Sequence, residues 1–193
     1  MKKEIKIAVV GAGYWGKNLV RAFYELGCLS VVCDSNIEIL SDLGKKYPDL
    51  KTTTDFTEIL NNKKINGIVI SLPAEVHYGF SKEAILSGKN VFVEKPLALN
   101  HIEAEELIKL AAENNKIIMV GHLLQYHPVF IKLKEIVRSG GLGRINYLYS
   151  NRLNLGKIRR EENILWSFAP HDISMILSLT NEEPESIFTS GGY

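Results

Sequence analysis

The chain has 193 residues, of which 46% are hydrophobic and 23% are charged, a composition typical of a globular protein with a substantial core. Its net charge of +1 argues against nucleic-acid binding, and no apolar stretch approaches the roughly 20 residues of a membrane-spanning helix. We therefore expect a cytoplasmic protein with no nucleic-acid or membrane partner, no metal centre, and reduced thiols at Cys28 and Cys33.

Short apolar runs alternate with helical patterns over the first part of the chain. In chain order, the patterns predict strand 5–10, helix 14–26, strand 29–34, helix 37–46, strand 51–54, helix 55–60, strand 67–71, helix 75–87, strand 90–94, helix 100–114 and strand 117–121. Asp55 and Asn100 are suited to cap the helices that follow them. Such alternation is typical of an α/β fold, a doubly wound parallel sheet covered on both faces. We assign this domain to residues 1–122.

The pattern changes in the remainder of the chain, which we assign to a second, partial domain over residues 123–193. It predicts helix 128–138, strand 144–155, helix 171–179 and strand 185–190. The alternation within 144–155 favours an antiparallel strand with one covered face. We interpret the unit as an incomplete α+β domain holding the start of an antiparallel sheet. Because a two-stranded sheet is barely stable alone, we expect the natural protein to be longer.

A glycine-rich loop, GAGYWG, follows the first predicted strand and opens the first helix. In this position Gly11 permits a tight turn, Gly13 lets a pyrophosphate approach the backbone, and Gly16 lets helix and strand pack closely. The helix N-terminus adds amide donors for phosphate, and Tyr14 and Trp15 complete the predicted cofactor contacts. The motif predicts a Rossmann domain that binds a dinucleotide.

Asp34 ends the second predicted strand, about 20 residues beyond the loop, where a carboxylate accepts hydrogen bonds from the adenosine ribose. It would repel a 2′-phosphate, and Ser35 and Asn36 supply no compensating positive charge. We therefore predict NAD rather than NADP as the cofactor. The alternative is a simple glycine turn followed by a solvated aspartate.

Lys95 follows the strand predicted over 90–94, in the tripeptide Glu94-Lys95-Pro96. Residues just past the carboxyl ends of parallel strands face the ligand crevice. A lysine there can bind a substrate hydroxyl and polarise the carbon that becomes a carbonyl. The alternative is an ordinary solvent-exposed loop.

Together these motifs resemble the Gfo/Idh/MocA family, the glucose–fructose oxidoreductase and inositol dehydrogenase group. The resemblance covers essentially the whole chain and includes the glycine loop, Ser71-Leu72-Pro73 with His77, Glu94-Lys95-Pro96, Gly121-His122 and His171-Asp172. It implies NAD(P)-dependent hydride transfer at a sugar or cyclitol carbon, with Lys95 as a catalytic residue. It also implies cofactor contacts from Ser71, Pro73, His77, Glu94 and Lys95. For His77, a locally bonded histidine on a helix face is an equal alternative.

Two further segments, 121–128 and 166–172, are similar to a branch of the family associated with sugar nucleotides. The resemblance implies that His171 is the catalytic base, located at the start of a helix. The predicted substrate contacts are Lys95, His122, Gln125, Tyr126, Arg152, Trp166, Ser167 and His171.

Several of these substrate contacts have alternatives. Ser167 stands where the family usually carries an aspartate, and it can bond a sugar hydroxyl but holds no charge. Arg152, with Arg159 and Arg160, suits a substrate diphosphate or a solvated basic stretch. His122 and Trp166 suit either packing or substrate contact, and we expect Asp172 to be a helix-start carboxylate.

The leading hypothesis is therefore an NAD-dependent sugar oxidoreductase that acts on a small-molecule sugar, preferably a nucleotide sugar. Such a protein would form a homo-oligomer if its second domain is complete. The alternative is an NAD-binding protein without catalysis, either a regulator or a truncated remnant of such an enzyme.

Overall fold

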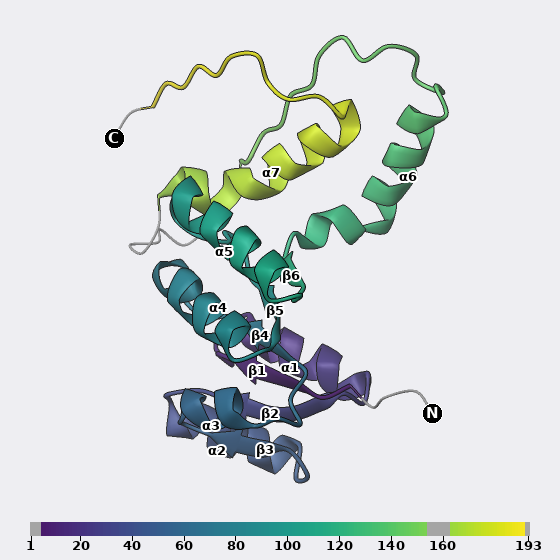
Figure 1. Ribbon diagram of the computed structural model, residues 1–193. Coiled ribbons are helices and arrows are strands. Elements are labelled where there is room, and N and C mark those ends of the chain that lie inside the picture. The colour runs from purple at the N-terminus through teal and green to yellow at the C-terminus, as the bar shows by residue number, and fades with distance from the viewer. Residues whose placement is uncertain (1–4, 154–162, 192–193) are drawn as a thin grey trace. The chain divides into compact units, whose positions relative to one another are not determined.

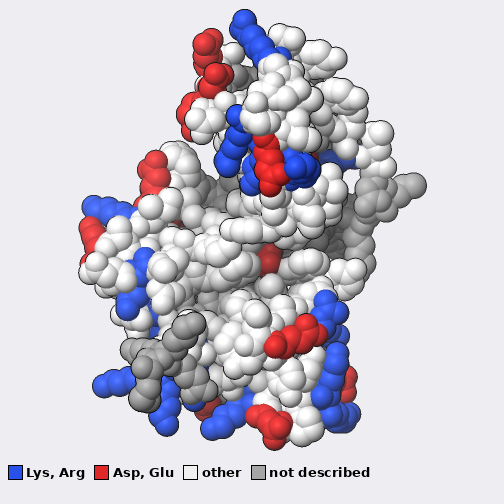
Figure 2. All heavy atoms as spheres, turned by 90° about the vertical axis from the view of Figure 1, so that its right-hand side faces the viewer, with Lys and Arg blue, Asp and Glu red and all other residues white. Residues whose placement is uncertain are grey.

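The computed structural model describes residues 5–153 and 163–191. Contacts within the chain divide it into two units, 1–121 and 122–193. No helix in the described ranges combines the length and apolar character that crossing a membrane requires. On the face drawn in Figure 2, Lys and Arg side chains are interspersed with Asp and Glu.

The first unit contains a six-stranded sheet in the order β3-β2-β1-β4-β5-β6, and every neighbouring pair is parallel (Figure 1). The strands are β1 (Ile7–Val10), β2 (Leu29–Cys33), β3 (Lys51–Thr53), β4 (Gly67–Ile70), β5 (Asn90–Val93) and β6 (Ile118–Val120). The predicted doubly wound parallel sheet is thereby confirmed. The strand order changes direction between β1 and β4, which is where such sheets open a crevice for ligands.

Helices connect successive strands of this sheet, with bounds close to the predicted ones. They are α1 (Gly16–Glu25), α2 (Ile37–Lys46), α3 (Phe56–Asn61), α4 (His77–Leu86) and α5 (His101–Glu113), and a short 3₁₀ turn, η1 (Ala74–Val76), precedes α4. The side chains of Asp55 and Asn100 accept hydrogen bonds from the backbone N–H groups of Thr57 and Glu103, which confirms both predicted caps.

The core lies on both faces of the sheet because successive strand residues point to opposite sides. On one face Ala8 and Ile68 pack with buried residues of α3, α4 and α5. On the other face Val9 and Val69 pack with buried residues of α1 and α2. The apolar runs of the central strands are thus buried on both sides, which leaves the strand ends as the places for polar chemistry.

The second unit contains a 3₁₀ turn, η2 (Leu123–Tyr126), and the helices α6 (Pro128–Arg138) and α7 (Ile164–Thr180). The α6 bounds match the prediction. The expected start of the next helix at His171 is wrong, because α7 begins at Ile164, with the Asn163 side chain accepting from Trp166 N–H, and continues through Pro170. Proline removes one backbone donor inside a helix without always ending it, so His171 and Asp172 lie within α7 rather than at its start.

The predicted start of an antiparallel sheet is not formed in the described part of this unit. Residues 144–153 and 185–190 have no strand assignment, and residues 154 and 155 of the first predicted strand lie outside the described ranges. Tyr147 and Tyr149 are 79% and 78% exposed, so their side chains do not cover a core in the described ranges. A strand needs a neighbour to satisfy its backbone groups, and alternating sequence alone does not supply one.

A matched pair of substitutions on α5 tests this account of the core. Leu107 is fully buried, whereas the next residue, Ile108, is 55% exposed. Leu107→Ala should lower the free energy of unfolding by about 2–5 kcal/mol through lost burial and a cavity, and Ile108→Ala should change it by about 0.5 kcal/mol or less. Urea unfolding followed by circular dichroism measures both, and equal effects would contradict the core as described.

Candidate cofactor and active site

The glycine loop after β1 is shaped by contacts that leave no space for side chains. Gly11 has φ of +88°, and a Cβ there would collide with the Ser71 carbonyl beyond β4. A Cβ on Gly16 would collide with the Gly11 carbonyl, whereas Gly13 has open space around it. Gly11 and Gly16, where a side chain would collide, therefore determine the shape of the turn, and the open space at Gly13 gives a ligand access to the backbone.

Asp34, directly after β2, is fixed beside this loop. Its Oδ2 accepts a hydrogen bond of 2.7 Å from Ala12 N–H, and its Oδ1 accepts one of 2.9 Å from Asn36 N–H. Each carboxylate oxygen has a further lone pair that a ribose hydroxyl can use. The carboxylate therefore orders the loop and remains a suitable acceptor for ribose.

Backbone hydrogen bonds align the residues that follow neighbouring strands. Gly11 N–H donates to Cys33 O, Ser71 N–H to Val10 O, Glu94 N–H to Ile70 O and Gly121 N–H to Val93 O, all at 2.8–2.9 Å. The end of the sheet at which the parallel strands have their carboxyl termini, here called the carboxyl edge, thus presents the glycine loop, Ser71 and Glu94 in a row. Lys95 follows Glu94 directly.

The Glu94 carboxylate is enclosed at this edge. Its Oε1 accepts a hydrogen bond of 2.8 Å from the Trp15 indole N–H. A Cβ on Gly121 would lie 2.9 Å from both carboxylate oxygens, so glycine leaves the space that the carboxylate occupies. Burial raises the pKa of Glu94, partly offset by the Trp15 bond and by the nearby His77 and Lys95.

His77 joins the segments that follow β4 and β5. Its ring is 1% exposed, with Nδ1 2.6 Å from the Pro96 carbonyl oxygen and Nε2 2.8 Å from the Leu72 carbonyl oxygen. Each ring nitrogen is thus within hydrogen-bond distance of a backbone carbonyl oxygen, and the nitrogen that carries the proton donates to its carbonyl. This geometry favours the locally bonded alternative, in which His77 shapes the wall around Lys95 without itself touching a cofactor.

The second unit gathers several of the predicted substrate residues around α7. The rings of His122 and His171 are 6.0 Å apart in an edge-on arrangement. The Gln125 amide donates a hydrogen bond of 2.7 Å to Ser174 O and accepts one of 3.2 Å from Lys134. Gln125 therefore ties η2 to α6 and α7 in addition to any role toward substrate.

Arg152 and Asp172 form an ion pair within the second unit. Arg152 Nε and Nη2 donate to the two Asp172 oxygens at 2.8 Å and 3.1 Å, and Ser150 Oγ donates at 2.9 Å. Burial alone would raise the pKa of Asp172, but these bonds outweigh it and lower the pKa. The expectation that Asp172 is a helix-start carboxylate is wrong because Asp172 lies in the interior of α7, and its ion pair neutralises part of the Arg152 charge.

The remaining predicted substrate residues lie in the same unit. Trp166 and Ser167 are half-buried at the start of α7, and Tyr126 at the end of η2 is 63% exposed. Arg159 and Arg160 lie outside the described residues. Lys95 belongs to the first unit and His171 to the second.

Besides the Arg152–Asp172 ion pair, two features of the site were not predicted from the sequence. The Trp15–Glu94 bond joins residues 79 apart, and local patterns carry no signal for such a pair. The space that Gly121 gives to Glu94 had a weak signal, since a glycine directly after a strand often marks close approach.

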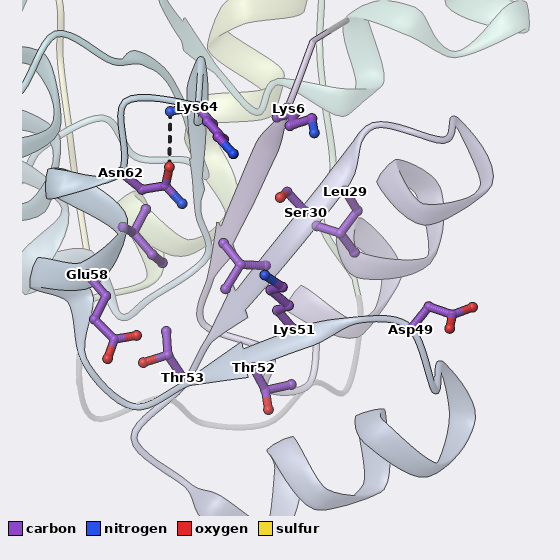
Figure 3. A pocket seen from close by; sticks show the side chains of 12 residues that line it. Lys6, Leu29, Ser30, Asp49, Lys51, Thr52, Thr53, Glu58, Asn62 and Lys64 are labelled. Atoms are coloured by element: carbon purple, nitrogen blue, oxygen red, sulfur yellow. Dashed lines mark hydrogen bonds between the residues drawn. The ribbon is translucent and has the colours of Figure 1, made fainter.

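A cavity of about 560 Å³ lies apart from this site (Figure 3). It is lined by the first residues of β2, by β3 and α3, and by Lys6 and Lys64, which precede β1 and β4. Since the strands are parallel, these residues place it toward the amino ends of the central strands, away from the glycine loop. In Figure 3, Lys64 N–H donates to the Asn62 side chain at 3.0 Å.

A parallel sheet of this order, with a glycine loop after β1 and a carboxylate after β2, defines a dinucleotide-binding domain. Residues 5–122 match the model of the Gfo/Idh/MocA family, described as "Oxidoreductase family, NAD-binding Rossmann fold", and the chain belongs to this family. The match confirms the predicted Rossmann fold, the family resemblance and NAD as the cofactor.

Three known proteins illustrate the relationship. The chain is 24% identical to the UDP-N-acetylglucosamine 3-dehydrogenase of Acidithiobacillus ferrooxidans, over 97% of this chain and 58% of that protein. It is 24% identical to the 2,7-anhydro-N-acetylneuraminate hydratase of Mediterraneibacter gnavus, over 98% of this chain and 53% of that protein. The structure of GenD2 from gentamicin A biosynthesis, in complex with NAD, matches with a TM-score of 0.68 and 26% identity, covering 73% of this chain and 41% of that one. The chain spans about half the length of the curated relatives it matches.

The buried Glu94 carboxylate gives a pH-dependent prediction. Because its pKa is raised in the folded state, its charge costs stability above that pKa, and the cost disappears as the pH falls and the group protonates. Glu94→Gln keeps an oxygen acceptor for Trp15 but carries no charge. It should raise the melting temperature at pH 8 by roughly 2–4 °C, with a smaller gain at pH 5.

Thermal unfolding across this pH range measures the effect, with Glu105→Gln, on the exposed side of α5, as the control. A gain in melting temperature that is equal at all pH values, or that grows toward acidic pH, would contradict the stability cost assigned to the Glu94 charge.

Proposed function

We propose that this chain holds NAD along the carboxyl edge of its sheet and supports hydride transfer to or from a sugar ring carbon. The observation that carries the proposal is the row of strand ends that places Asp34, the glycine loop and Glu94-Lys95 on one edge. The residues fit the cofactor, because the space beside Gly13 and the acceptors on Asp34 are those that a pyrophosphate and a ribose require.

The chemistry assigns one role to each group. NAD, when bound, accepts the hydride that leaves the carbon bearing the hydroxyl. The Lys95 ammonium binds the substrate oxygen and stabilises negative charge on it as the carbonyl forms. His171 takes the hydroxyl proton, so that the alcohol loses one hydride and one proton in total. The Glu94 carboxylate partly neutralises the positive charge of the neighbouring Lys95 side chain.

We further propose a nucleotide sugar as the substrate. The relative from A. ferrooxidans carries a UDP-linked sugar in its name and aligns with 97% of this chain. On the second unit, His122, Trp166 and Ser167 offer ring and hydroxyl contacts for a sugar, and Arg152 can share its charge between Asp172 and a diphosphate.

A second candidate function is a reaction of a sugar without net oxidation. It is favoured by the M. gnavus relative, which is named a hydratase and aligns with 98% of this chain. Adding or removing water leaves the oxidation level unchanged, so such a reaction would convert sugar without accumulating NADH. Chromatography of products beside NADH absorbance separates it from the dehydrogenase reaction.

Replacement of Lys95 tests the catalytic assignment. Lys95→Ala should lower kcat by about 10²–10⁴-fold on a turned-over nucleotide sugar, because the developing charge on oxygen loses its cation. NAD affinity, measured by calorimetry, should change little. Lys109→Ala, on the exposed face of α5 at 77% side-chain exposure, is the control.

Retained turnover in Lys95→Ala would exclude Lys95 as a catalytic residue. Intact NAD binding by the wild-type chain, with no conversion of any sugar, would instead favour the non-catalytic NAD-binding protein.

Replacement of Asp34 tests the choice of cofactor. Asp34→Asn keeps its size but removes the charge that repels a 2′-phosphate. The ratio of NAD affinity to NADP affinity should fall by about tenfold, since a charge-assisted bond and a repulsion are both lost. Asp42→Asn on α2, with a side chain 78% exposed, is the control. An unchanged ratio would show that Asp34 does not select the cofactor.

A further inference from the structure

The Trp15–Glu94 hydrogen bond connects two parts of the carboxyl edge that are not neighbours in the sheet. Trp15 belongs to the glycine loop after β1, and Glu94 follows β5. Strand β4 lies between β1 and β5, so the bond passes over the end of β4. The crevice between β1 and β4 is where the strand order reverses and where a dinucleotide lies. The bond therefore bridges the predicted path of the cofactor.

The glutamate end of this bridge has little freedom to move. Gly121 leaves just enough space for the carboxylate, since a Cβ there would lie 2.9 Å from both of its oxygens. The Glu94 backbone continues the β4–β5 ladder through its N–H bond of 2.9 Å to Ile70 O. Lys95 is the next residue, and its segment is held by the His77 ring through the Pro96 carbonyl oxygen at 2.6 Å. A displacement of Glu94 would thus be transmitted to Lys95.

The tryptophan end is more open. Trp15 is 40% exposed, so in the free protein its bond to Glu94 is partly accessible to water. A ligand lying along the edge would exclude that water, and a charge-assisted hydrogen bond strengthens when it is desolvated. The bond should therefore contribute more when the edge is occupied than when it is empty.

The two halves of a dinucleotide meet different parts of this edge. Asp34 and Gly13 lie at β2 and β1, on the adenosine and pyrophosphate side, whereas Glu94 lies at β5 on the nicotinamide side. ADP-ribose keeps both riboses and the pyrophosphate but lacks the nicotinamide ring, so it leaves unoccupied the place beside Glu94-Lys95 where that ring would lie. NADH reaches both groups, so a comparison of the two ligands isolates the contribution of the bridge.

We propose that Trp15 is a positioning residue that, through its indole N–H bond to Glu94, couples the glycine loop to the Glu94-Lys95 segment at the nicotinamide end. The proposal rests on the proposed function in one respect, namely that NAD lies along this edge. In this proposal, Trp15, a residue of the phosphate-binding loop, influences the Glu94-Lys95 segment beside the nicotinamide.

Calorimetric titration with NADH and with ADP-ribose tests the coupling. Trp15→Phe keeps an aromatic ring but removes the N–H donor. It should weaken NADH binding by about tenfold and leave ADP-ribose binding close to that of the wild type. Tyr24→Phe, which changes an aromatic residue at the far end of α1, is the matched control and should alter neither affinity.

Variants at Glu94 provide the second arm. Glu94→Ala should weaken NADH binding to the same extent as Trp15→Phe, and the double variant should be no weaker than either single one. Glu94→Gln retains an acceptor but not the charge, so it should recover part of the loss. Circular dichroism of each variant establishes that it is folded.

Each other outcome overturns the proposal. Equal losses for NADH and ADP-ribose would show that Trp15 acts only on the phosphate loop, and additive losses would show that the two residues act separately. If the wild-type chain binds neither ligand, the proposed function fails together with the coupling. If it binds both and Trp15→Phe changes nothing, the coupling alone fails.

Discussion

The close approach of the loop after β1 to the end of β4 is the constraint on which the rest of the site depends. Gly11 lies against the Ser71 carbonyl, and Gly16 lies against Gly11, so side chains at these positions would push α1 away from the sheet. With α1 held there, its N-terminus points at the carboxyl edge, and Trp15 comes within reach of Glu94. The backbone geometry that suits a pyrophosphate thus also determines which side chains meet at the other end of the edge.

The polar groups along this edge are supported by backbone atoms rather than by each other alone. Asp34 accepts from two N–H groups of the chain, and His77 is engaged with two carbonyl oxygens. Such support holds a site in place without a ligand, which reduces the ordering cost of binding. Glu94 is also supported, by Lys95 N–H and by the Trp15 indole, but burial of its charge raises its pKa and costs stability. Under the proposed function, a destabilising charge at the cofactor-binding edge is an example of a trade-off between stability and activity.

Most of the first unit could be predicted from the sequence because its signals are local. The run around Val9 and Val69 is buried on both faces, and Asp55 and Asn100 cap the helices that they precede. The second unit could not be predicted as well. Alternation around Tyr147 indicates a strand only if a partner strand is present, and the described residues supply none. The helix predicted over 171–179 begins too late, because the Asn163 side chain caps α7 and the helix starts at Ile164.

The site contacts that were missed have a common physical cause. Trp15–Glu94 and Arg152–Asp172 each join residues that are distant in sequence, and each depends on how strands or helices pack. Residue type identified Trp15, Glu94 and Arg152 as candidates for ligand binding, whereas Asp172 was expected only to be a helix-start carboxylate. Their internal bonds change that interpretation in different ways. The Asp172 pairing uses part of the Arg152 charge, whereas the bond to Trp15 adds a function to Glu94 because it links the two ends of one edge. Under the proposed function, cofactor binding depends on the glycine loop, on Asp34 and, through its bond to Trp15, on Glu94, whereas the chemical step depends on Lys95.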